Sequence, residues 1–320
     1  MNIKNSIKDR RIVLLIIIVF SLILMSFISP YFMNSANLLS LLRYSTVVGL
    51  LALAQTPIIL GGAGGIDLSV GSSLSLSSVV FGLLAVRVGL NPWSAVIATL
   101  LISLLFGLFN GFFITIIKLP PLIVTLASMY LFSSAAMVLS GGKDINGFDS
   151  HHFALLGQGV FLDIPNQVSF VLIPCFIVLS YVMRKSIFGR HVYAIGSSAE
   201  AAKLAGIKVV RTRIYLYVLS SFLAAVGAIV TASWLLNARP TSGNELLLPS
   251  ITIAVLGGIV ITGGIGTISG TFLALLLVAI LNSGMQLAGI DSTFQIGLLG
   301  IVLLVSILIR SKDQARAVVV

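Results

Sequence analysis

The chain has 320 residues, of which 58% are hydrophobic and 9% charged, and its mean hydropathy is +1.14. Soluble domains carry roughly 25% charged residues. A chain of this length would need a far more polar surface to fold in water, so the composition excludes a soluble enzyme, a disordered chain and a disulfide-bonded secreted domain. We expect an all-α polytopic membrane protein in which residues 1–320 form a single transmembrane domain.

The formal net charge is +10, with 19 Lys and Arg against 9 Asp and Glu. These basic residues lie in short segments between apolar runs, which is typical of cytoplasmic connections and not of a nucleic-acid site. The single cysteine, Cys175, lies inside an apolar run and leaves no partner for a disulfide within the chain. The charge therefore gives information about orientation in the membrane.

Apolar runs long enough to cross a bilayer, about 20 residues each, recur along the chain. Ten are expected, and 248–262 is the shortest; the others cover 12–29, 38–60, 68–87, 92–117, 121–140, 168–183, 214–236, 267–287 and 293–310. The first run is longer than the core of a secretory signal and has no Ala-x-Ala cleavage site, so a retained span is favoured over a signal peptide.

The distribution of Lys and Arg predicts that both termini are cytoplasmic. Four basic residues fall on the outer side: Arg43, Arg87, Lys143 and Arg239. The other fifteen fall on the inner side: Lys4, Lys8, Arg10, Arg11, Lys118, Arg184, Lys185, Arg190, Lys203, Lys208, Arg211, Arg213, Arg310, Lys312 and Arg316.

Two connections are long enough to carry structure of their own. The outer one, 141–167, contains the short apolar element FALLGQGVFL, and the inner one, 184–213, is strongly basic. Within the inner connection we expect a short helix that Ser198 caps, with Glu200 in its first turn and Gly206 at its end. Ala201, Ala202 and Leu204 make this segment more apolar than a solvated loop, which favours a protein-docking element over a lipid-attracted basic loop.

Several kinds of chemistry have no motif in this sequence. There is no Gly-x-x-x-x-Gly-Lys-Ser/Thr phosphate loop, no paired-cysteine metal motif, and no run of ionisable residues inside the spans. Asp149, His151 and His152 are the one group of the metal- or proton-binding type, and a solvated loop is the favoured interpretation because adjacent histidines do not share a helix face. Energy for transport is therefore expected from an ATP-hydrolysing partner, with no cofactor on this chain.

A glycine-rich segment, GGAGGIDLSVGS at 61–72, joins the second and third spans. Its glycines permit a sharp reversal, and Asp67, helped by Ser69, is expected to cap the next helix. A capped turn is the simpler interpretation. The alternative is a translocation pathway, because bare backbone at membrane depth survives only inside protein or along a wet cavity.

A similar segment, GGIGTISGT at 263–271, repeats part of this pattern at an offset of 199 residues. Gly64, Gly65 and Gly71 match Gly263, Gly264 and Gly270, and the flanking positions agree as well. We interpret the two segments as similar reversals on the same side of the membrane, framing a common centre.

The fourth span carries Asn110 between Gly107 and Gly111. The two glycines predict close helix packing. Asn110 is expected either to bond across helices or to face a polar solute, and the sequence leaves both open.

With GGIDLSVGS, AIGSSAEAAKLAGI and GGIGTISGT in that order, the chain resembles the membrane permeases of ribose-type ATP-binding-cassette (ABC) sugar importers over nearly its whole length. The segments ARPTSGNELLLPSITIAVLGG and PPLIVTLASMYLFSSAAMVLSGG look most like autoinducer-2 import permeases. The sequence departs from the usual family pattern at Ser197-Ser198 and at Ser250–Ala254, which affects the helix cap and a pore-side helix.

The resemblance implies the ABC importer permease fold with ten helices in a bacterial inner membrane. Its implied partners are a second permease, two cytoplasmic ATPases that hold ATP and Mg, and an external solute-binding protein, with lipid around the spans and no nucleic acid. It places a coupling helix near 198–207, with candidate ATPase contacts at Ser198, Glu200, Ala201, Ala202, Lys203, Leu204 and Gly206. Candidate pathway or gate residues are Gly64, Gly65, Asp67, Ser69, Gly71, Asn110, Gly263, Gly264 and Gly270.

The expected function is translocation of a monosaccharide or sugar-like solute, and the chain is not expected to be an enzyme by itself. The alternatives are a branched-chain amino acid permease of related architecture and, less favoured, an ion-coupled secondary carrier.

Overall fold

The computed structural model describes residues 3–62, 64–148, 151–291 and 293–304, and these ranges are predominantly helical. Within these described ranges, eight helical segments are long and apolar enough to cross a membrane. They contain α1 (Ile3–Ile28), α2 (Ser35–Leu60), α3 (Val70–Gly82) continued by the π-helical turn η1 (Leu83–Arg87), α4 (Pro92–Thr115), α5 (Pro121–Ser140), η2 (Val168–Leu172) continued by α7 (Ile173–Lys185), α10 (Val209–Leu235) and α12 (Ile268–Leu287).

The two remaining expected spans have different outcomes. The run at 248–262 forms only the ten-residue helix α11 (Leu247–Leu256), because Gly257 and Gly258 end it and turns follow. The last helix is described over Thr293–Leu304, and positions 305–310 of the expected span lie outside the described residues. Eight of the ten expected spans are thus confirmed as full-length helices.

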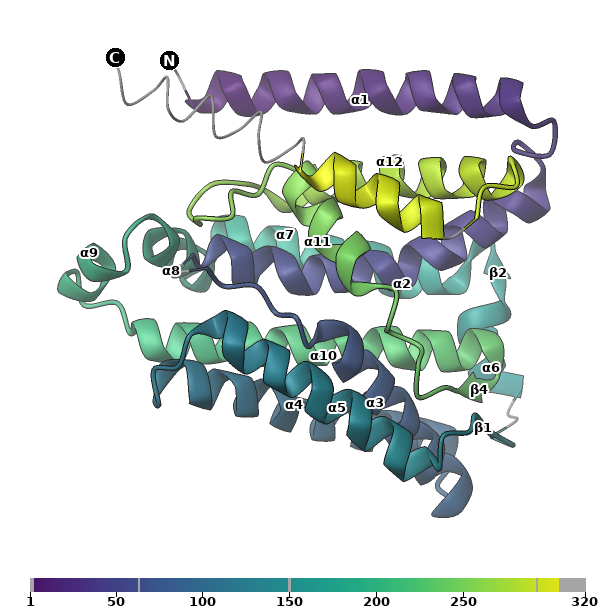
Figure 1. Cartoon of the computed structure of the whole chain (residues 1–320), viewed down its shortest axis with the longest axis horizontal. Helices are drawn as coiled ribbons and strands as arrows, with labels where there is room; N and C mark the ends of the chain where they lie inside the picture. Colours follow the sequence, from purple (N-terminus) through teal and green to yellow (C-terminus); the bar gives the residue numbers. More distant parts are fainter. Residues whose placement is uncertain (1–2, 63, 149–150, 292, 305–320) are drawn as a thin grey trace.

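The long helices lie side by side in one bundle (Figure 1). Helix α10 packs against α4, α2 and α3, while α2 also packs against α11 and α12. Every residue of α2 from Ser45 to Leu60 is buried, as is nearly all of the serine-rich α3. The centre of the bundle is therefore α2, α3 and α10, and it carries buried hydroxyl groups as well as apolar side chains.

Helices α1, α4 and α5 lie at the edges of the bundle and expose large apolar side chains (Figure 1). In water such surfaces would be unfavourable, but in a bilayer they face hydrocarbon. These faces agree with the membrane protein that the composition predicts.

One end of the bundle carries the outer connection expected at 141–167. The connection contains α6 (His151–Gln158), β1 (Ile145–Asn146), β2 (Val160–Phe161) and β3 (Ile164–Pro165). Strand β2 pairs with β3, and β1 pairs with β4 (Asn237–Ala238), which follows α10. Stacked rings fix α6 to α3, because the Phe81 and Phe153 centroids lie 5.0 Å apart. Arg239 bonds Asp144 at 2.8 Å across the β1–β4 pairing.

The opposite end carries α8 (Ile187–Ser197) and α9 (Ala199–Leu204), which project beyond the long helices in Figure 1. Arg11 of α1 and Arg184 of α7 also lie at this end, since they donate to Thr267 and Ser269 at the start of α12. Arg43 and Arg87 instead bond carbonyls of Gln158 and Leu139 at the end that carries α6. The basic residues thus divide between the two ends as the sequence predicts.

Candidate translocation and coupling site

The reversal at 61–69 brings an acidic side chain into the interior of the bundle. Asp67 is only 2% exposed, and its carboxylate accepts bonds from the backbone N–H of Ser69 (2.9 Å), the hydroxyl of Ser69 (2.6 Å) and the hydroxyl of Ser220 on α10 (2.7 Å). Burying a carboxylate is costly unless it is hydrogen-bonded, and three donors meet this requirement.

This geometry corrects the expected helix cap. Asp67 bonds the amide of Ser69, the residue before α3, instead of the free N–H groups inside the first turn, and the side chain of Ser69 makes no capping bond. Asp67 also lies buried inside the bundle. Its role in the structure is to tie the reversal to α10.

Other polar side chains continue this cluster onto neighbouring helices. Gln55 of α2 holds the backbone of Asp67 from both sides, donating to its carbonyl (2.6 Å) and accepting from its N–H (3.2 Å). Asn110 of α4 donates to the Ser69 hydroxyl (2.8 Å), and Thr125 of α5 donates to the carbonyl of Ile66. Of the two roles left open for Asn110, the structure shows the bond across helices.

We call Gln55, Asp67, Ser69, Asn110 and Ser220 the polar hub. Its members come from α2, the first reversal, α4 and α10, and all five are buried. The sequence indicates Asp67, Ser69 and Asn110 as site residues but does not indicate Gln55 and Ser220. Gln55 could have been found because it is a polar residue within an apolar run. Ser220 has no such signal, because serines are common inside apolar helices.

The two glycine-rich reversals contact each other. The N–H of Gly264 donates to the carbonyl of Leu60 at 2.9 Å, and a Cβ atom added to Gly263 would overlap the backbone of Gly62. Gly62, Gly263 and Gly264 all have positive φ, which glycine adopts without strain. The expected common centre is therefore a direct backbone crossing.

The other glycines of the repeated pattern have different surroundings. Gly65 is buried beside Ile58. Gly64 is exposed, and a Cβ atom added to it would have no neighbouring atom within 4 Å. Gly71 lies against the backbone of Gly243, and Gly270 against that of Gly257. Gly71 and Gly270 thus let the beginnings of α3 and α12 approach segments that flank α11.

Helix α4 also lies close to α10. A Cβ atom on Gly107 would overlap the backbone of Tyr217 and Val218, and one on Gly111 would come within 3.1 Å of Ile214. This contact is the close packing that the two glycines predict, and it places Asn110 within hydrogen-bonding distance of Ser69.

Helix α9 has the caps that the sequence predicts. The Ser198 hydroxyl accepts from the N–H of Ala201 (3.2 Å), and Glu200 lies in the first turn. Gly206 has φ +82°, and the N–H of Ile207 donates to the carbonyl of Ala202, so a left-handed glycine closes the helix.

The exposed face of α9 differs from the expected one by a single residue. Ala202 is buried, so it secures the helix to the bundle and does not contribute to the outer face. Leu204 is 90% exposed. The remaining candidate contacts that are also exposed are Ser198, Glu200, Ala201, Lys203 and Gly206.

The end of α8 links α9 to both reversals, and no sequence motif predicts this link. A Cβ on Gly196 would overlap the carbonyl of Leu60 and the N–H of Gly264, so three backbones meet there. The Tyr193 hydroxyl donates to the carbonyl of Gly266 (3.0 Å). Burial raises the pKa of Tyr193, opposed by the nearby charge of Arg184, so this hydroxyl keeps its donor proton at neutral pH. We call Leu60, Gly62, Gly196, Gly263 and Gly264 the backbone junction.

Comparison with known proteins agrees with this architecture. Residues 37–307 match the family described as the permease component of branched-chain amino acid transport systems. The ribose import permease RbsC of Bacillus subtilis is 38% identical over 294 residues, covering 92% of this chain and 90% of that protein. The autoinducer 2 import system permease LsrD of an Enterobacter species is 35% identical over 309 residues, covering 95% and 93%. No solved structure matches the chain.

The chain therefore belongs to this family of transport permeases. It is a multi-pass membrane protein with the all-α permease fold of ABC importers, and it has the role of a membrane-spanning transport subunit.

Proposed function

We propose that the whole chain, residues 1–320, is one transmembrane domain that forms the translocation subunit of an ATP-driven importer for a monosaccharide or sugar-like solute in the bacterial inner membrane. It would work beside a second permease, receive solute from an external binding protein, and be driven by two ATPase subunits that hold ATP and Mg. Both termini and α9 would lie on the cytoplasmic side.

The observation that carries this proposal is the position of α9. An exposed, doubly capped helix sits on α8, and α8 ends in the backbone junction where both reversals meet. A force applied to the face that Ala201 and Leu204 expose would reach α2 and α12 through backbone contacts, without passing through flexible side chains. Such an element fits a subunit driven by a separate motor.

The relatives support a sugar-like solute. The family description names branched-chain amino acids, but the ribose and autoinducer 2 permeases match at 35–38% identity over more than nine-tenths of this chain. We therefore favour a sugar-like solute over a branched-chain amino acid. The rarity of ionisable residues in the spans argues against an ion-coupled carrier, since ion-coupled carriers use such residues along their route.

The proposed coupling role predicts that Ala201→Asp abolishes solute-stimulated ATPase activity in the reconstituted complex. The new carboxylate would lie in the centre of the exposed face, where docking to the ATPase would remove its water without supplying an ion-pair partner. The caps at Ser198 and Gly206 remain, so the permease should still insert and bind the external protein. Ala201→Ser is the matched control and should keep normal stimulation. Normal stimulation in Ala201→Asp would leave α9 an ordinary surface turn.

Substrate class is tested separately in membrane vesicles with the binding protein present. We expect the vesicles to take up a labelled furanose. This uptake should require ATP and should not change when the proton gradient is collapsed. Uptake of leucine in its place would favour the amino acid alternative, and dependence on the proton gradient would favour a secondary carrier.

A further inference from the structure

A pocket of 380 Å³ opens where α4 ends and α5 and α10 begin. Its lining includes Thr115 from α4, Lys118 from the connection, Pro121 from α5, and Val209 and Arg213 from α10. This is the end of the bundle that carries α8 and α9 (Figure 1). The volume lies near the lower end of the roughly 300–1,000 Å³ typical of ligand sites.

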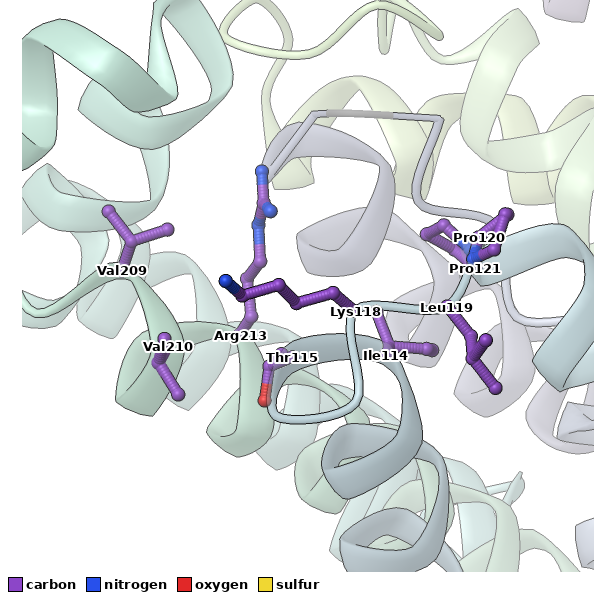
Figure 2. A pocket seen from close by; sticks show the side chains of 9 residues that line it. All are labelled: Ile114, Thr115, Lys118, Leu119, Pro120, Pro121, Val209, Val210 and Arg213. Carbon is purple, nitrogen blue, oxygen red and sulfur yellow. The ribbon is translucent and has the colours of Figure 1, made fainter.

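Two cations face this space and no acid does. In Figure 2 the Lys118 side chain extends from the connection toward the α10 side of the pocket, where Arg213 rises from the helix. None of the nine lining residues is acidic, and within the described parts of the chain neither cation has an ion-pair partner. Like charges around one pocket repel each other, so an anion bound there would relieve an unfavourable arrangement.

The backbone holds Lys118 in an unusual conformation. Its φ is +64°, a left-handed value that a non-glycine side chain rarely adopts. The connection is fixed by bonds from the N–H groups of Ile117 and Leu119 to carbonyls of α4. This left-handed conformation at the end of α4 sets the direction in which the charged side chain leaves the backbone.

The surroundings of the pocket select the kind of anion. The connection and the first turns of α5 and α10 expose Ile116, Ile117, Leu122, Ile123 and Val210, each by 47–61%. This apolar surface continues along the exposed faces of α4 and α5. A free phosphate would leave it uncovered, whereas acyl chains attached to a phosphate would cover it.

We propose that this pocket binds the headgroup phosphate of an anionic phospholipid, with Lys118 and Arg213 contacting the phosphate and the acyl chains lying along α4 and α5. Basic pockets between transmembrane helices are suited to such headgroups. The inference depends on the chain spanning a membrane and is independent of the solute that it transports.

The test is native mass spectrometry of the purified full-length chain in detergent, titrated with phosphatidylglycerol, phosphatidylcholine or inorganic phosphate. We expect preferential retention of phosphatidylglycerol by the wild-type chain. The double variant Lys118→Asn/Arg213→Gln should lose this preference, with roughly a fivefold fall in affinity for each charge removed. Asn is chosen at position 118 because it tolerates positive φ.

Lys143→Gln, an exposed charge at the other end of the bundle, is the matched control and should bind like wild type. If the double variant does not fold, Lys118→Asn alone should weaken binding and Lys118→Arg should retain it. Equal binding of the two lipids, or an unchanged preference in the charge variants, overturns the proposal. Displacement of phosphatidylglycerol by equimolar phosphate would also overturn it, in favour of a free-anion site.

Discussion

Asp67 stands out at the residue scale because both of its oxygens are bonded inside the protein. One oxygen accepts from Ser69, the residue before α3, and the other accepts from Ser220 in the middle of α10. Gln55 adds a pair of bonds to the same backbone. Asp67 therefore has a structural role that does not require direct contact with solute.

Asp67→Asn should be mild and Asp67→Ala severe. The Asn oxygen can accept from the Ser69 amide, and its NH₂ group can donate to the Ser220 hydroxyl, which rotates to accept. Alanine would leave the Ser69 amide and two hydroxyls without an acceptor. Each buried group left unsatisfied should lower the free energy of unfolding by about 1–3 kcal/mol. Thermal unfolding in detergent, and uptake at matched membrane levels, would measure the difference.

Ser220→Ala is the control for this pair, because it removes one donor and should fall between wild type and Asp67→Ala. If Asp67→Asn and Asp67→Ala insert equally well and are equally inactive, the charge itself belongs to the transport cycle and the structural role is insufficient.

At the element scale, the backbone junction is the feature with mechanical consequences. Three segments from distant parts of the sequence meet there without side chains between them, at Gly62, Gly196 and Gly263. Close-packed backbones transmit displacement with little slack, because they have no rotamers through which to relax. The end of α8, the end of α2 and the segment before α12 should therefore move together.

Gly196→Ala is expected to uncouple ATPase activity from transport. Its methyl group would overlap the carbonyl of Leu60 and the N–H of Gly264, so the Gly264–Leu60 hydrogen bond must lengthen and α8 must move away. The prediction is a loss of at least tenfold in uptake per ATP hydrolysed in proteoliposomes containing the full complex.

Gly297→Ala provides the comparison, since this glycine also lies in a helix and has open space around its Cβ direction. It should transport normally. Full coupling in Gly196→Ala would show that the junction tolerates separation and does not transmit force.

The sequence predicts the long helices well because a bilayer imposes one simple requirement, an apolar run of sufficient length. It also predicts α9, since Ser198 and Gly206 are local signals that act within one or two turns. It does not predict the length of α11, because hydropathy continues past Leu256 while two glycines end the helix. Local signals therefore account for elements, and they fail where backbone conformation overrides composition.

The partners of the candidate site could not be predicted for a different reason. The shared glycine pattern at 64–72 and 263–271 indicates similar turns but contains no information about the distance between them. A serine such as Ser220 is common inside apolar helices, and nothing in its neighbourhood specifies that it faces Asp67. These pairings depend on tertiary packing across 153 residues of sequence, as in the Ser220–Asp67 bond, and only the folded arrangement reveals them.

At the scale of the whole molecule, the two ends of the bundle differ in charge and in structure. Arg11, Arg184 and α9 mark one end, while the Arg239–Asp144 pair and α6 mark the other. Lys and Arg concentrate on the cytoplasmic side of membrane proteins. The end that carries α9 is therefore expected to face the cytoplasm, where an ATPase would meet it.

This orientation predicts opposite labelling of two single cysteines. Lys203→Cys on α9 and Lys143→Cys in the outer connection are both exposed, and each is made in a Cys175→Ala background to remove the native thiol. In intact cells an impermeant maleimide should label position 143 and leave position 203 unmodified, and permeabilisation should make position 203 reactive. The Cys175→Ala parent, which has no thiol, sets the background. Labelling of position 203 in intact cells would reverse the orientation and place α9 out of reach of a cytoplasmic ATPase, so the coupling role of the backbone junction would fail with it.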